Sequence, residues 1–321
     1  MPSEFDLIQR FFTRPTASAV LGVGDDAALL QVSPGKLLAV SSDMLLAGRH
    51  FLPDADPCLL GHKTLAVNLS DLAAMGATPR WATLALALPD ADEAWLSAFS
   101  RGFFALADRF GVELVGGDTT AGPLNLCVTI FGETGTRPLR RDAAKVGDDI
   151  WVSGDLGGAA LGLAHLLGET VLNDNDVAAC LVRLHQPEPR IALGLALAQL
   201  ARVAAIDISD GLLADLGHIL ERSGVGAEVA LGRLPAHPAL LPMLPESSLA
   251  RRCLLAGGDD YELCFTAPTQ DAPAIQSAAV ANGVVVSRVG RISAQAGLRV
   301  LDQDGVQLLI EERGFDHFAS D

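Results

Sequence analysis

The chain has 321 residues, half of them apolar, and its formal net charge at neutral pH is −16. This length exceeds the usual size of one domain, so we expect two domains, each with its own core. A chain this acidic lacks the basic face of nucleic-acid binders, and we expect no nucleic-acid partner. An acidic balance becomes informative where carboxylates cluster, because crowded aspartates stay ionised together only when cations hold them.

Targeting and membrane signals are not evident. The first thirty residues show no basic stretch followed by a long apolar one, and the most apolar later segment, 191–206, is interrupted by Gln199 and Arg202. The five cysteines are scattered without CxxC spacing, mostly in apolar runs, which is typical of reduced, packed thiols. These features predict a cytoplasmic protein with no membrane partner.

The first half of the chain alternates helices and strands. A short helix over 4–12 precedes a strand over 36–40, which we expect to be buried and to end in the polar run 41–43. Apolar residues at helical spacing predict a helix over 59–75 that carries Asp71 in its later part and stops at Gly76. Further along we expect a strand over 81–88, a helix over 93–110, a strand over 112–115 ending in 116–118, and a strand over 126–132.

A polar stretch with four basic residues and a proline, 135–147, indicates a domain boundary. We divide the chain into an N-terminal domain, 1–137, and a C-terminal domain, 138–321. The second domain begins with a strand over 149–152 and a glycine-rich turn that opens an Ala- and Leu-rich helix. Helices over 176–184 and 190–202, a strand over 204–208 and a helix from about 209–211 follow. The last third is strand-rich, with strands over 228–231, 261–265, 284–289 and 298–301 and helices between them.

Six segments place aspartate beside glycine or serine, and most of them follow a short apolar strand. They are residues 22–27, 41–43 with 48–50, 68–71, 116–120, 207–211 and 257–262. Each alone could be an ordinary turn or a helix's polar face. Six in one chain favour a site where several carboxylates share divalent cations. Mg²⁺ is usually held by one or two carboxylates plus phosphates and waters, so a multi-magnesium site implies a polyphosphate ligand such as ATP.

Other nucleotide and hydrolase motifs are missing. The chain has no GxxxxGK[ST], and none of its three lysines lies in a glycine-rich loop. The protein-kinase HRD and DFG signatures, a GxSxG elbow and HExxH are also absent. P-loop, protein-kinase, serine-hydrolase and zinc-protease chemistry therefore have no support.

In order and spacing, the six segments closely resemble the thiamine-monophosphate kinase family. The resemblance rests on Gly-Asp-Asp-Ala at 24–27, Ser-Ser-Asp at 41–43, Gly-Arg-His-Phe at 48–51, Asn-Leu-Ser-Asp-Leu at 68–72, Gly-Gly-Asp-Thr-Thr at 116–120, Asp-Ile-Ser-Asp-Gly-Leu at 207–212 and Gly-Gly-Asp-Asp-Tyr-Glu-Leu at 257–263. It implies the two-domain fold of aminoimidazole-ribonucleotide-synthetase-like proteins: an N-terminal α/β domain that pairs with its copy in a homodimer, and a C-terminal α+β domain that closes over the site. The implied reaction converts ATP and thiamine monophosphate to ADP and thiamine diphosphate.

The resemblance also implies roles for individual residues. The positions that match magnesium ligands are Asp26, Ser41, Ser42, Asp43, Asp71, Asp118, Asp207 and Asp210. Gly117, Asp118, Arg141 and Ser209 match nucleotide contacts, and His50, Asp259 and Phe315 match contacts to thiamine phosphate. One departure is that members of the family commonly have Glu where this chain has Asp259.

The acceptor phosphate is already largely ionised at neutral pH, so direct in-line transfer needs no general base. Several Mg²⁺ ions and Arg141 would stabilise the charge on the transferred group, with Asp43, Asp71 and Asp207 at the centre of catalysis. Phe315 could instead be a packed tail aromatic. Two rivals stay open: another ATP-using member of the same superfamily, and a nucleotide-binding regulator that keeps the fold without turnover.

Overall fold

The computed structural model of the chain describes residues 3–309 and Gly314. The chain forms two compact units: unit 1 comprises residues 1–72 and 77–136, and unit 2 comprises residues 73–76 and 137–321. Within the described residues, no helix is long and apolar enough to cross a membrane.

Unit 1 begins with a short helix, α1 (Glu4–Leu7), which continues directly into a π-helix, Ile8–Phe12. The side chain of Ser3 caps α1 by accepting a hydrogen bond from the Asp6 amide at 3.2 Å, and the Ser3 amide donates to the Asp6 carboxylate at 2.9 Å. The helix predicted over 4–12 is therefore confirmed, although its second half is wound more loosely than an α-helix.

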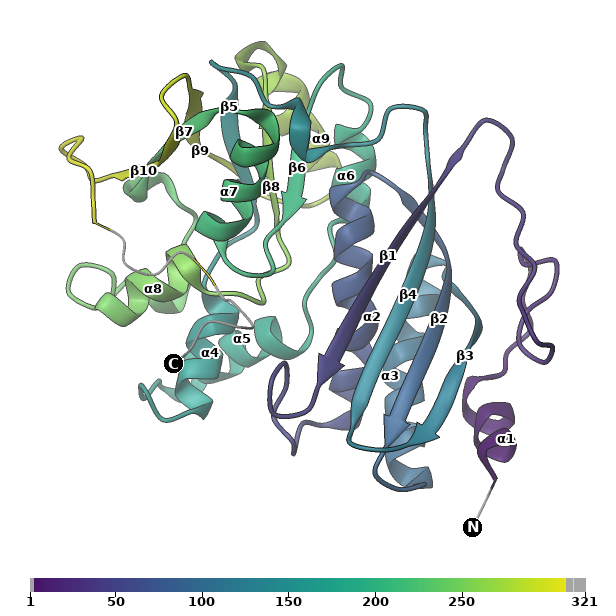
Figure 1. Cartoon of the computed structure of the whole chain (residues 1–321). Coiled ribbons are helices and arrows are strands. Elements are labelled where there is room, and N and C mark those ends of the chain that lie inside the picture. The colour runs from purple at the N-terminus through teal and green to yellow at the C-terminus, as the bar shows by residue number, and fades with distance from the viewer. Residues whose placement is uncertain (1–2, 310–313, 315–321) are drawn as a thin grey trace. The chain divides into compact units, whose positions relative to one another are not determined.

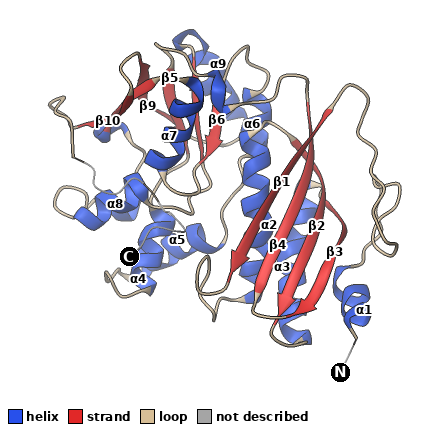
Figure 2. Ribbon diagram, in the orientation of Figure 1, coloured by secondary structure: helices blue, strands red, loops and turns tan. Residues whose placement is uncertain are grey.

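The centre of unit 1 is a four-stranded sheet with two helices on one face. Its strands lie in the order β1-β4-β2-β3, where β4 is antiparallel to both β1 and β2, and β2 is parallel to β3. The helices α2 (Pro57–Ala74) and α3 (Glu93–Phe110) cover the same face, as Figures 1 and 2 show. The strands are β1 (Leu37–Leu46), β2 (Thr78–Leu88), β3 (Glu113–Ala121) and β4 (Asn125–Thr134).

Two glycines let α2 and α3 pack backbone to backbone. A Cβ atom on Gly61 would lie 2.1 Å from the Phe99 carbonyl oxygen, and one on Gly102 would lie 1.8 Å from that of Cys58. Helix α3 itself has clear ends, because the Asp92 side chain caps its N-terminus and Gly111 adopts the left-handed conformation that ends it. Its predicted range, 93–110, is confirmed.

Strand β1 differs from its prediction in length and in burial. The strand was expected to end before Ser41, but pairing with β4 continues to Leu46, so residues 41–43 lie in its middle. It was also expected to be buried, and this is wrong, because β1 is an edge strand whose face away from the helices is uncovered. Val40 and Met44 on that face are 54% and 50% exposed. In the same way β3 continues to Ala121 through residues 116–118, because it pairs with β2 along that whole length.

Unit 2 is built on a six-stranded, mostly antiparallel sheet. The strand order is β10-β7-β9-β5-β8-β6, and only the β10–β7 pair is parallel. Ile150 and Val152 face one core, while Trp151 stacks on Phe265 on the other face of the sheet. The strands are β5 (Asp149–Ser153), β6 (Ala204–Asp207), β7 (Gly226–Ala230), β8 (Leu263–Ala267), β9 (Val286–Ser293) and β10 (Gly297–Leu301).

Helices cover this sheet, and the most strongly amphipathic one is α7 (Leu212–Ser223), which buries Leu212, Leu216 and Ile219 in the core. Helix α6 ends earlier than predicted, because the amides of Gln199 and Leu200 bond three residues back and tighten the chain into a turn before β6. The other helices are α4 (Gly158–Leu166), α5 (Asp174–His185), α6 (Ile191–Leu197), α8 (Ser248–Ala256) and α9 (Ala272–Ala281). The α/β and α+β composition of the prediction is confirmed.

Candidate active site

In unit 1, one group of predicted residues lies between β1 and α2. The Ser41 hydroxyl donates a short hydrogen bond to the Asp71 carboxylate, and the Asp43 amide donates to the Asn68 side-chain oxygen at 3.2 Å. Asn68 is buried and donates to the Thr64 carbonyl at 3.1 Å, so its orientation is fixed. Because Asp71 and Asn68 share one face of α2, this helix holds the polar middle of β1 in place.

Ser42 and Asp118 lie on the opposite, uncovered face of the same sheet. Ser42 exchanges a 2.7 Å hydrogen bond with Thr129 on β4, whereas Asp118 lies on β3 at the other edge. Since neighbouring strands are about 4.8 Å apart, strands β1 and β3 are separated by roughly 14 Å across the sheet. One magnesium ion, whose ligands lie near 2.1 Å, cannot be held by Ser42 and Asp118 of one chain together.

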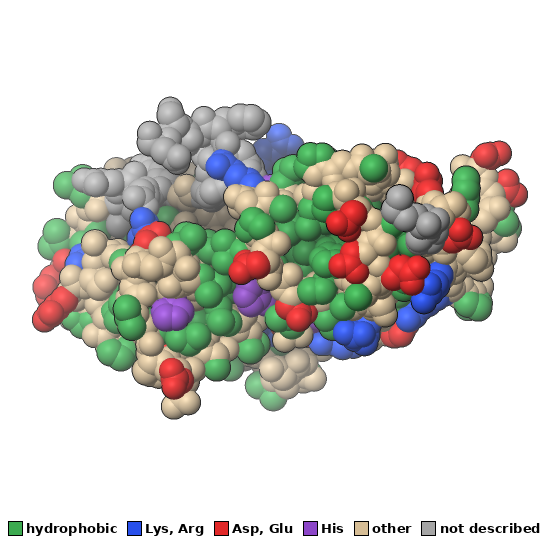
Figure 3. Space-filling model, turned by 90° about the horizontal axis from the view of Figure 1, so that it is seen from below, with side chains coloured by type: hydrophobic (Ala, Val, Ile, Leu, Met, Phe, Trp, Pro, Cys, Tyr) green, Lys and Arg blue, Asp and Glu red, His purple; other side chains and the backbone are tan. Residues whose placement is uncertain are grey.

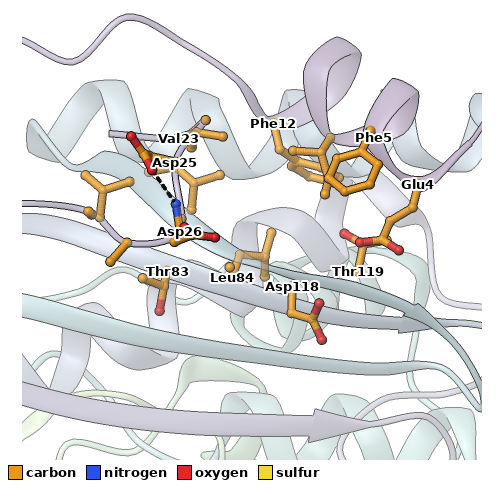
Figure 4. A pocket seen from close by; sticks show the side chains of 18 residues that line it. Glu4, Phe5, Phe12, Val23, Asp25, Asp26, Thr83, Leu84, Asp118 and Thr119 are labelled. Carbon is orange, nitrogen blue, oxygen red and sulfur yellow. Dashed lines mark hydrogen bonds between the residues drawn. The ribbon is translucent and has the colours of Figure 1, made fainter. Parts of the chain in front are cut away.

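An open pocket of about 620 Å³ also lies within unit 1. Figure 4 shows Asp25 and Asp26 toward one side of it, Phe5, Phe12 and Glu4 toward the other, and Asp118 below. The Asp26 amide donates to the Asp25 carboxylate at 2.9 Å, which folds the turn tightly. The structure therefore brings Asp26 and Asp118, both predicted magnesium ligands, to one cavity. Its volume is in the range of small-molecule sites.

Gly117 forms part of the pocket wall and has a specific backbone reason to be glycine. A Cβ atom there would lie 1.8 Å from the Leu84 carbonyl oxygen of the neighbouring strand, and its φ of +152° disfavours other residues. Glycine thus lets β3 lie against β2 while its backbone is open to a ligand. This is the arrangement expected of a nucleotide contact.

His50 lies in the turn that follows β1. Its ring nitrogen Nδ1 accepts a hydrogen bond from the Leu46 amide at 3.1 Å, and its own amide donates to the Leu46 carbonyl at 3.0 Å. Because Nδ1 accepts this hydrogen bond, the neutral ring carries its hydrogen on the other nitrogen, Nε2, which points away from the turn. The turn thus fixes the orientation of the histidine ring.

In unit 2, the second group of predicted residues surrounds the end of β6. Asp207 is buried at the last position of the strand, and Ser209 and Asp210 follow in the turn that leads to α7. The carboxylate of Asp215, in the first turn of α7, accepts both the Ser209 and the Asp210 amides at 3.1 Å. Burial, with the nearby charges of Asp207 and Asp210, raises the pKa of Asp215 to about 8. Several carboxylates are therefore crowded at this strand end.

The loop 257–262 lies directly against that turn. The Asp259 amide donates to the Ser209 carbonyl at 2.9 Å, and the Tyr261 amide donates to the Ile208 carbonyl at 2.8 Å. Asp259 and Tyr261 both have positive φ, 68° and 50°, which costs a non-glycine residue energy. A strained backbone of this kind persists only where contacts with the surrounding residues hold it in that conformation.

Two carboxylates of this loop hold it in its strained conformation. Asp260 is half-buried and accepts the Gly157 amide with both oxygens at 2.9 Å, and the removal of its carboxylate from water raises its pKa well above the usual range. Glu262 accepts the Ser153 hydroxyl at 2.5 Å and forms a two-point ion pair with Arg190, whose Nε donates at 2.7 Å. Burial alone would lower the pKa of Arg190, but the hydrogen bonds and the charge of Glu262 outweigh it, so this pKa is raised.

Arg141 is not brought to Ser209 within unit 2. Its carbonyl accepts a hydrogen bond at 2.8 Å from Ser223, which is the last residue of α7, whereas Asp210 precedes the first. At 1.5 Å per residue the two ends of α7 are about 17 Å apart. Phe315, the predicted thiamine contact near the C-terminus, lies outside the described residues.

The oxygen donors of the predicted site residues fit magnesium, although each cluster of carboxylates is small. Among residues 3–309 and 314, no group of three or more His, Cys, Asp or Glu side chains lies close enough together to hold a metal ion. Mg²⁺ needs only one or two carboxylates when phosphates and waters supply the other ligands, so carboxylates in pairs fit it. Figure 3 shows several acidic side chains toward the right of the view, with basic side chains beside them.

Sequence reasoning missed the residues that support the site. Asp215, Asp260, Glu262 and Arg190 were given no role, although the first three are carboxylates in or just after the two motifs. A signal was present for Asp215, since an aspartate one turn into a helix that follows a polar strand end can accept the amides before it.

Known proteins match this chain over nearly its whole length. Residues 24–134 match the family described as AIR synthase related protein, N-terminal domain, and residues 145–303 match the corresponding C-terminal domain. The thiamine-monophosphate kinase of Salmonella typhimurium is 46% identical over 99% of this chain and 98% of its own length. The chain belongs to the thiamine-monophosphate kinase family. The Bacillus subtilis member of this family is 34% identical over 98% of the chain.

Solved structures of the thiamine-monophosphate kinase family share the fold of this chain. The enzyme from Stenotrophomonas maltophilia K279a is 50% identical, with a TM-score of 0.83 over 90% of this chain and 92% of its own. AaThiL complexed with AMPPCP and TMP is 32% identical, with a TM-score of 0.78 over 90% of this chain and 89% of its own. Escherichia coli HypE, a hydrogenase maturation protein, is 21% identical with a TM-score of 0.75 and shares the fold. The predicted two-domain fold is therefore confirmed.

Proposed function

We propose that this chain transfers the γ-phosphoryl group of ATP to thiamine monophosphate, giving ADP and thiamine diphosphate in a magnesium-dependent reaction. The observation that carries the proposal is the full-length identity of 46–47% to enzymes named thiamine-monophosphate kinase. A solved relative is described as complexed with AMPPCP, an ATP analogue, and with TMP, which matches both proposed substrates. The setting is cytoplasmic, where both substrates are available.

The carboxylates and hydroxyls of the Asp-rich segments would hold the cations. In unit 1 they are Asp26, Ser41, Ser42, Asp43, Asp71 and Asp118, and in unit 2 they are Asp207 and Asp210. All are hard oxygen donors of the kind that Mg²⁺ prefers. When bound, the ions neutralise the phosphates and stabilise the charge on the transferred group.

The remaining residues position the two substrates. The backbone at Gly117 is open on one side of β3 and would present its peptide group to a nucleotide. Ser209 lies in the turn pinned by Asp215, where its amide and its carbonyl are already hydrogen-bonded, so it would contact the nucleotide through its hydroxyl. His50 and Asp259 are each fixed by backbone hydrogen bonds and would contact thiamine phosphate, with Phe315 stacking on its ring. The chain needs no general base, because the attacking phosphate oxygen is already ionised at neutral pH.

A homodimer is part of this proposal. The uncovered face of the unit 1 sheet exposes four large apolar side chains of β1, Leu38, Val40, Met44 and Leu46, at 39–54%. A contiguous apolar face of this kind is typical of an interface. A second copy on this face would add its own Ser42 and Asp118, so that one ion could take ligands from two chains despite the separation of these residues in one chain. We therefore propose that the dimer completes the site.

The dimer is tested by the variant Met44→Lys, which places a charge in the centre of the exposed face. We expect sedimentation equilibrium to show a dimer for the wild type and a monomer for this variant, with loss of turnover. The matched control is Val280→Lys, since Val280 is 81% exposed on α9 of unit 2. A wild-type monomer, or a Met44→Lys dimer with full activity, contradicts the proposal.

The activity is tested by incubating purified protein with ATP, Mg²⁺ and thiamine monophosphate and measuring thiamine diphosphate. The Asp43→Asn variant should lose at least a hundredfold in kcat, and Asp54→Asn, at an exposed neighbouring position, should stay near the wild type. Chelation by EDTA should abolish turnover, and added Mg²⁺ should restore it. ADP production without thiamine diphosphate would overturn the acceptor assignment.

A further inference from the structure

The segment between the π-helix and β1 carries two aspartates of the pocket but almost no regular structure. Residues 13–36, all of which the structure describes, form no helix and only isolated β-bridges, and Figure 1 shows them as the purple segment between α1 and β1. A connection of this length loses much backbone entropy when it is held in one conformation. Asp26 can therefore serve as a cation ligand at a fixed place only if other parts of unit 1 hold this segment.

Glu113, the first residue of β3, holds the start of this segment. Its carboxylate accepts three consecutive backbone amides, those of Ala17 at 2.7 Å, Ser18 at 2.8 Å and Ala19 at 3.1 Å, and also the Ser18 hydroxyl at 2.9 Å. Burial alone would raise the pKa of Glu113, but these hydrogen bonds outweigh it, so this pKa is lowered. The ionised carboxylate therefore fixes both the position and the direction of the chain at residues 17–19.

Trp81 connects the same contact to the core of unit 1. It lies opposite Glu113 on β2, its side chain is fully buried, and its Nε1 donates to the Ser18 hydroxyl at 2.9 Å. Ser18 is thus held by two neighbouring strands at once. Because a close-packed tryptophan cannot shift without opening the core, this anchor is as rigid as the sheet itself.

A second glutamate holds the far end of the segment. The Ser33 amide and hydroxyl donate to the Glu133 carboxylate of β4 at 2.7 and 3.0 Å, and Glu133 is only 8% exposed. Between the two anchors, the Leu29 amide donates to the Leu21 carbonyl at 2.9 Å. This bond closes residues 21–29 into a short loop that has the two aspartates at its tip.

Strand β3 connects the Glu113 anchor to the pocket. Glu113 begins the strand and Asp118, five residues further on, lines the pocket, so the two lie about 17 Å apart on one rigid element. The same strand therefore sets the position of Asp118 and that of the loop that carries Asp26. Mg²⁺ demands near-ideal octahedral geometry with ligands at about 2.1 Å, so a ligand on a displaced loop loses affinity for the ion.

We propose that Glu113 is a positioning residue of the cation site: it holds residues 17–19 so that Asp26 is presented to the same cavity as Asp118. This inference rests on the proposed function for the identity of the ion and the nucleotide. Glu113 would not contact the ion, because both of its oxygens are occupied by the backbone and hydroxyl of residues 17–19. A merely structural contact predicts a loss of stability alone, whereas a positioning role also predicts a loss of Mg²⁺ affinity.

Magnesium binding tests this role without turnover. The full chain is titrated with Mg²⁺ in the presence of the ATP analogue AMPPCP, and calorimetry gives the Mg²⁺ concentration at half-saturation. Removing a residue that orients a metal ligand typically costs about 10- to 100-fold in metal affinity, so Glu113→Ala should need roughly tenfold more Mg²⁺. Glu113→Gln, whose side-chain oxygen can still accept two of the amides, should recover most of this loss.

Asp92→Ala is the matched control, because Asp92 also accepts two backbone amides in unit 1, at 2.8 and 3.0 Å, but caps α3. It should lower Tm, as Glu113→Ala does, and leave the Mg²⁺ requirement unchanged. In hydrogen exchange, the amides of residues 20–29 should exchange faster in Glu113→Ala and at the wild-type rate in Asp92→Ala. If Glu113→Ala does not fold, Glu113→Asp, which keeps the charge but is too short to reach all three amides, should show the same losses.

An unchanged Mg²⁺ requirement in Glu113→Ala, or an equal rise in Asp92→Ala, overturns the proposal, as does unaltered exchange over residues 20–29. If the wild type binds Mg²⁺ with AMPPCP in this Glu113-dependent way but makes no thiamine diphosphate, the proposed function fails while the positioning role stands. If thiamine diphosphate is formed but the Mg²⁺ requirement does not depend on Glu113, the proposed function stands and this inference fails.

Discussion

Replacing Glu262 with Gln should destabilise unit 2 by about 3 kcal/mol, which is the low end of the cost of breaking a buried ion pair. The side chain of Glu262 is 2% exposed and that of Arg190 is 13% exposed, so the guanidinium left behind cannot be solvated. Glutamine has the same shape as glutamate, and it still accepts a hydrogen bond from the Ser153 hydroxyl. The predicted loss therefore comes from the missing charge and not from a cavity.

The assay is thermal unfolding by calorimetry, at a pH where all carboxylates on the surface are ionised. For a unit of 150–250 residues each kcal/mol moves Tm by roughly 2–4 °C, so a loss of 3 kcal/mol corresponds to roughly 6–12 °C. The matched control is Glu169→Gln, which breaks the pair with Arg252, where both side chains are more than 40% exposed. That control should lose at most about 1 kcal/mol.

A double variant tests the buried ion pair of Glu262 and Arg190 in a second way. Replacing both members of a buried pair with apolar residues of similar size is often neutral, so Glu262→Met with Arg190→Met should recover much of the stability that Glu262→Met alone loses. Equal Tm shifts for Glu262→Gln and Glu169→Gln, or no recovery in the double variant, would refute the claim that the pair acts as a buried unit.

Two further variants probe the sheet of unit 1 and a buried histidine of unit 2. Gly117→Ala should abolish ATP binding and lower Tm, because its Cβ would overlap the Leu84 carbonyl, whereas Gly122→Ala, whose Cβ meets nothing closer than 3.5 Å, should bind ATP normally in the same titration. Burial lowers the pKa of His237, whose Nδ1 accepts the Ala239 amide at 3.3 Å, so the folded protein favours the neutral ring. Stability from this group is present above the unfolded pKa of about 6.5 and is lost as pH falls below it, and urea unfolding at pH 7.5 and 5.5 should show a smaller difference in His237→Gln than in the wild type.

Local signals were sufficient to predict most helices and the existence of most strands. Helix α3 was predicted to the residue, because Asp92 and Gly111 are capping residues whose effect is local. The ends of β1 and β3 were not predicted, because a strand extends as far as its neighbours pair with it, and those neighbours are distant in sequence. The polar residues 41–43 and 116–118 suggested strand ends, but they are polar because each pairs inside a sheet with one face toward a site.

The candidate site could likewise be predicted from the sequence only in part. The motifs themselves could be recognised from glycine and aspartate, and the structure brings Asp26 and Asp118 to one pocket and Ser41 to Asp71. The residues that hold the motifs in shape could not be recognised in this way. Arg190 is 72 positions from Glu262, and no spacing rule connects an arginine before a helix to a glutamate at the start of a strand.

The loop 257–262 joins stability to function in unit 2. Two residues with positive φ cost on the order of 1–3 kcal/mol each, and the loop keeps this conformation because Asp260 and Glu262 bind the chain on both sides of it. The same conformation places the Asp259 amide on the Ser209 carbonyl and so fixes a proposed acceptor contact against a proposed nucleotide contact. If the network relaxes, the strain is released by moving that loop. Glu262→Gln should then raise the KM for thiamine monophosphate more than that for ATP, since Asp259 lies in the strained loop itself, whereas Ser209 lies in the neighbouring turn and is also held by Asp215.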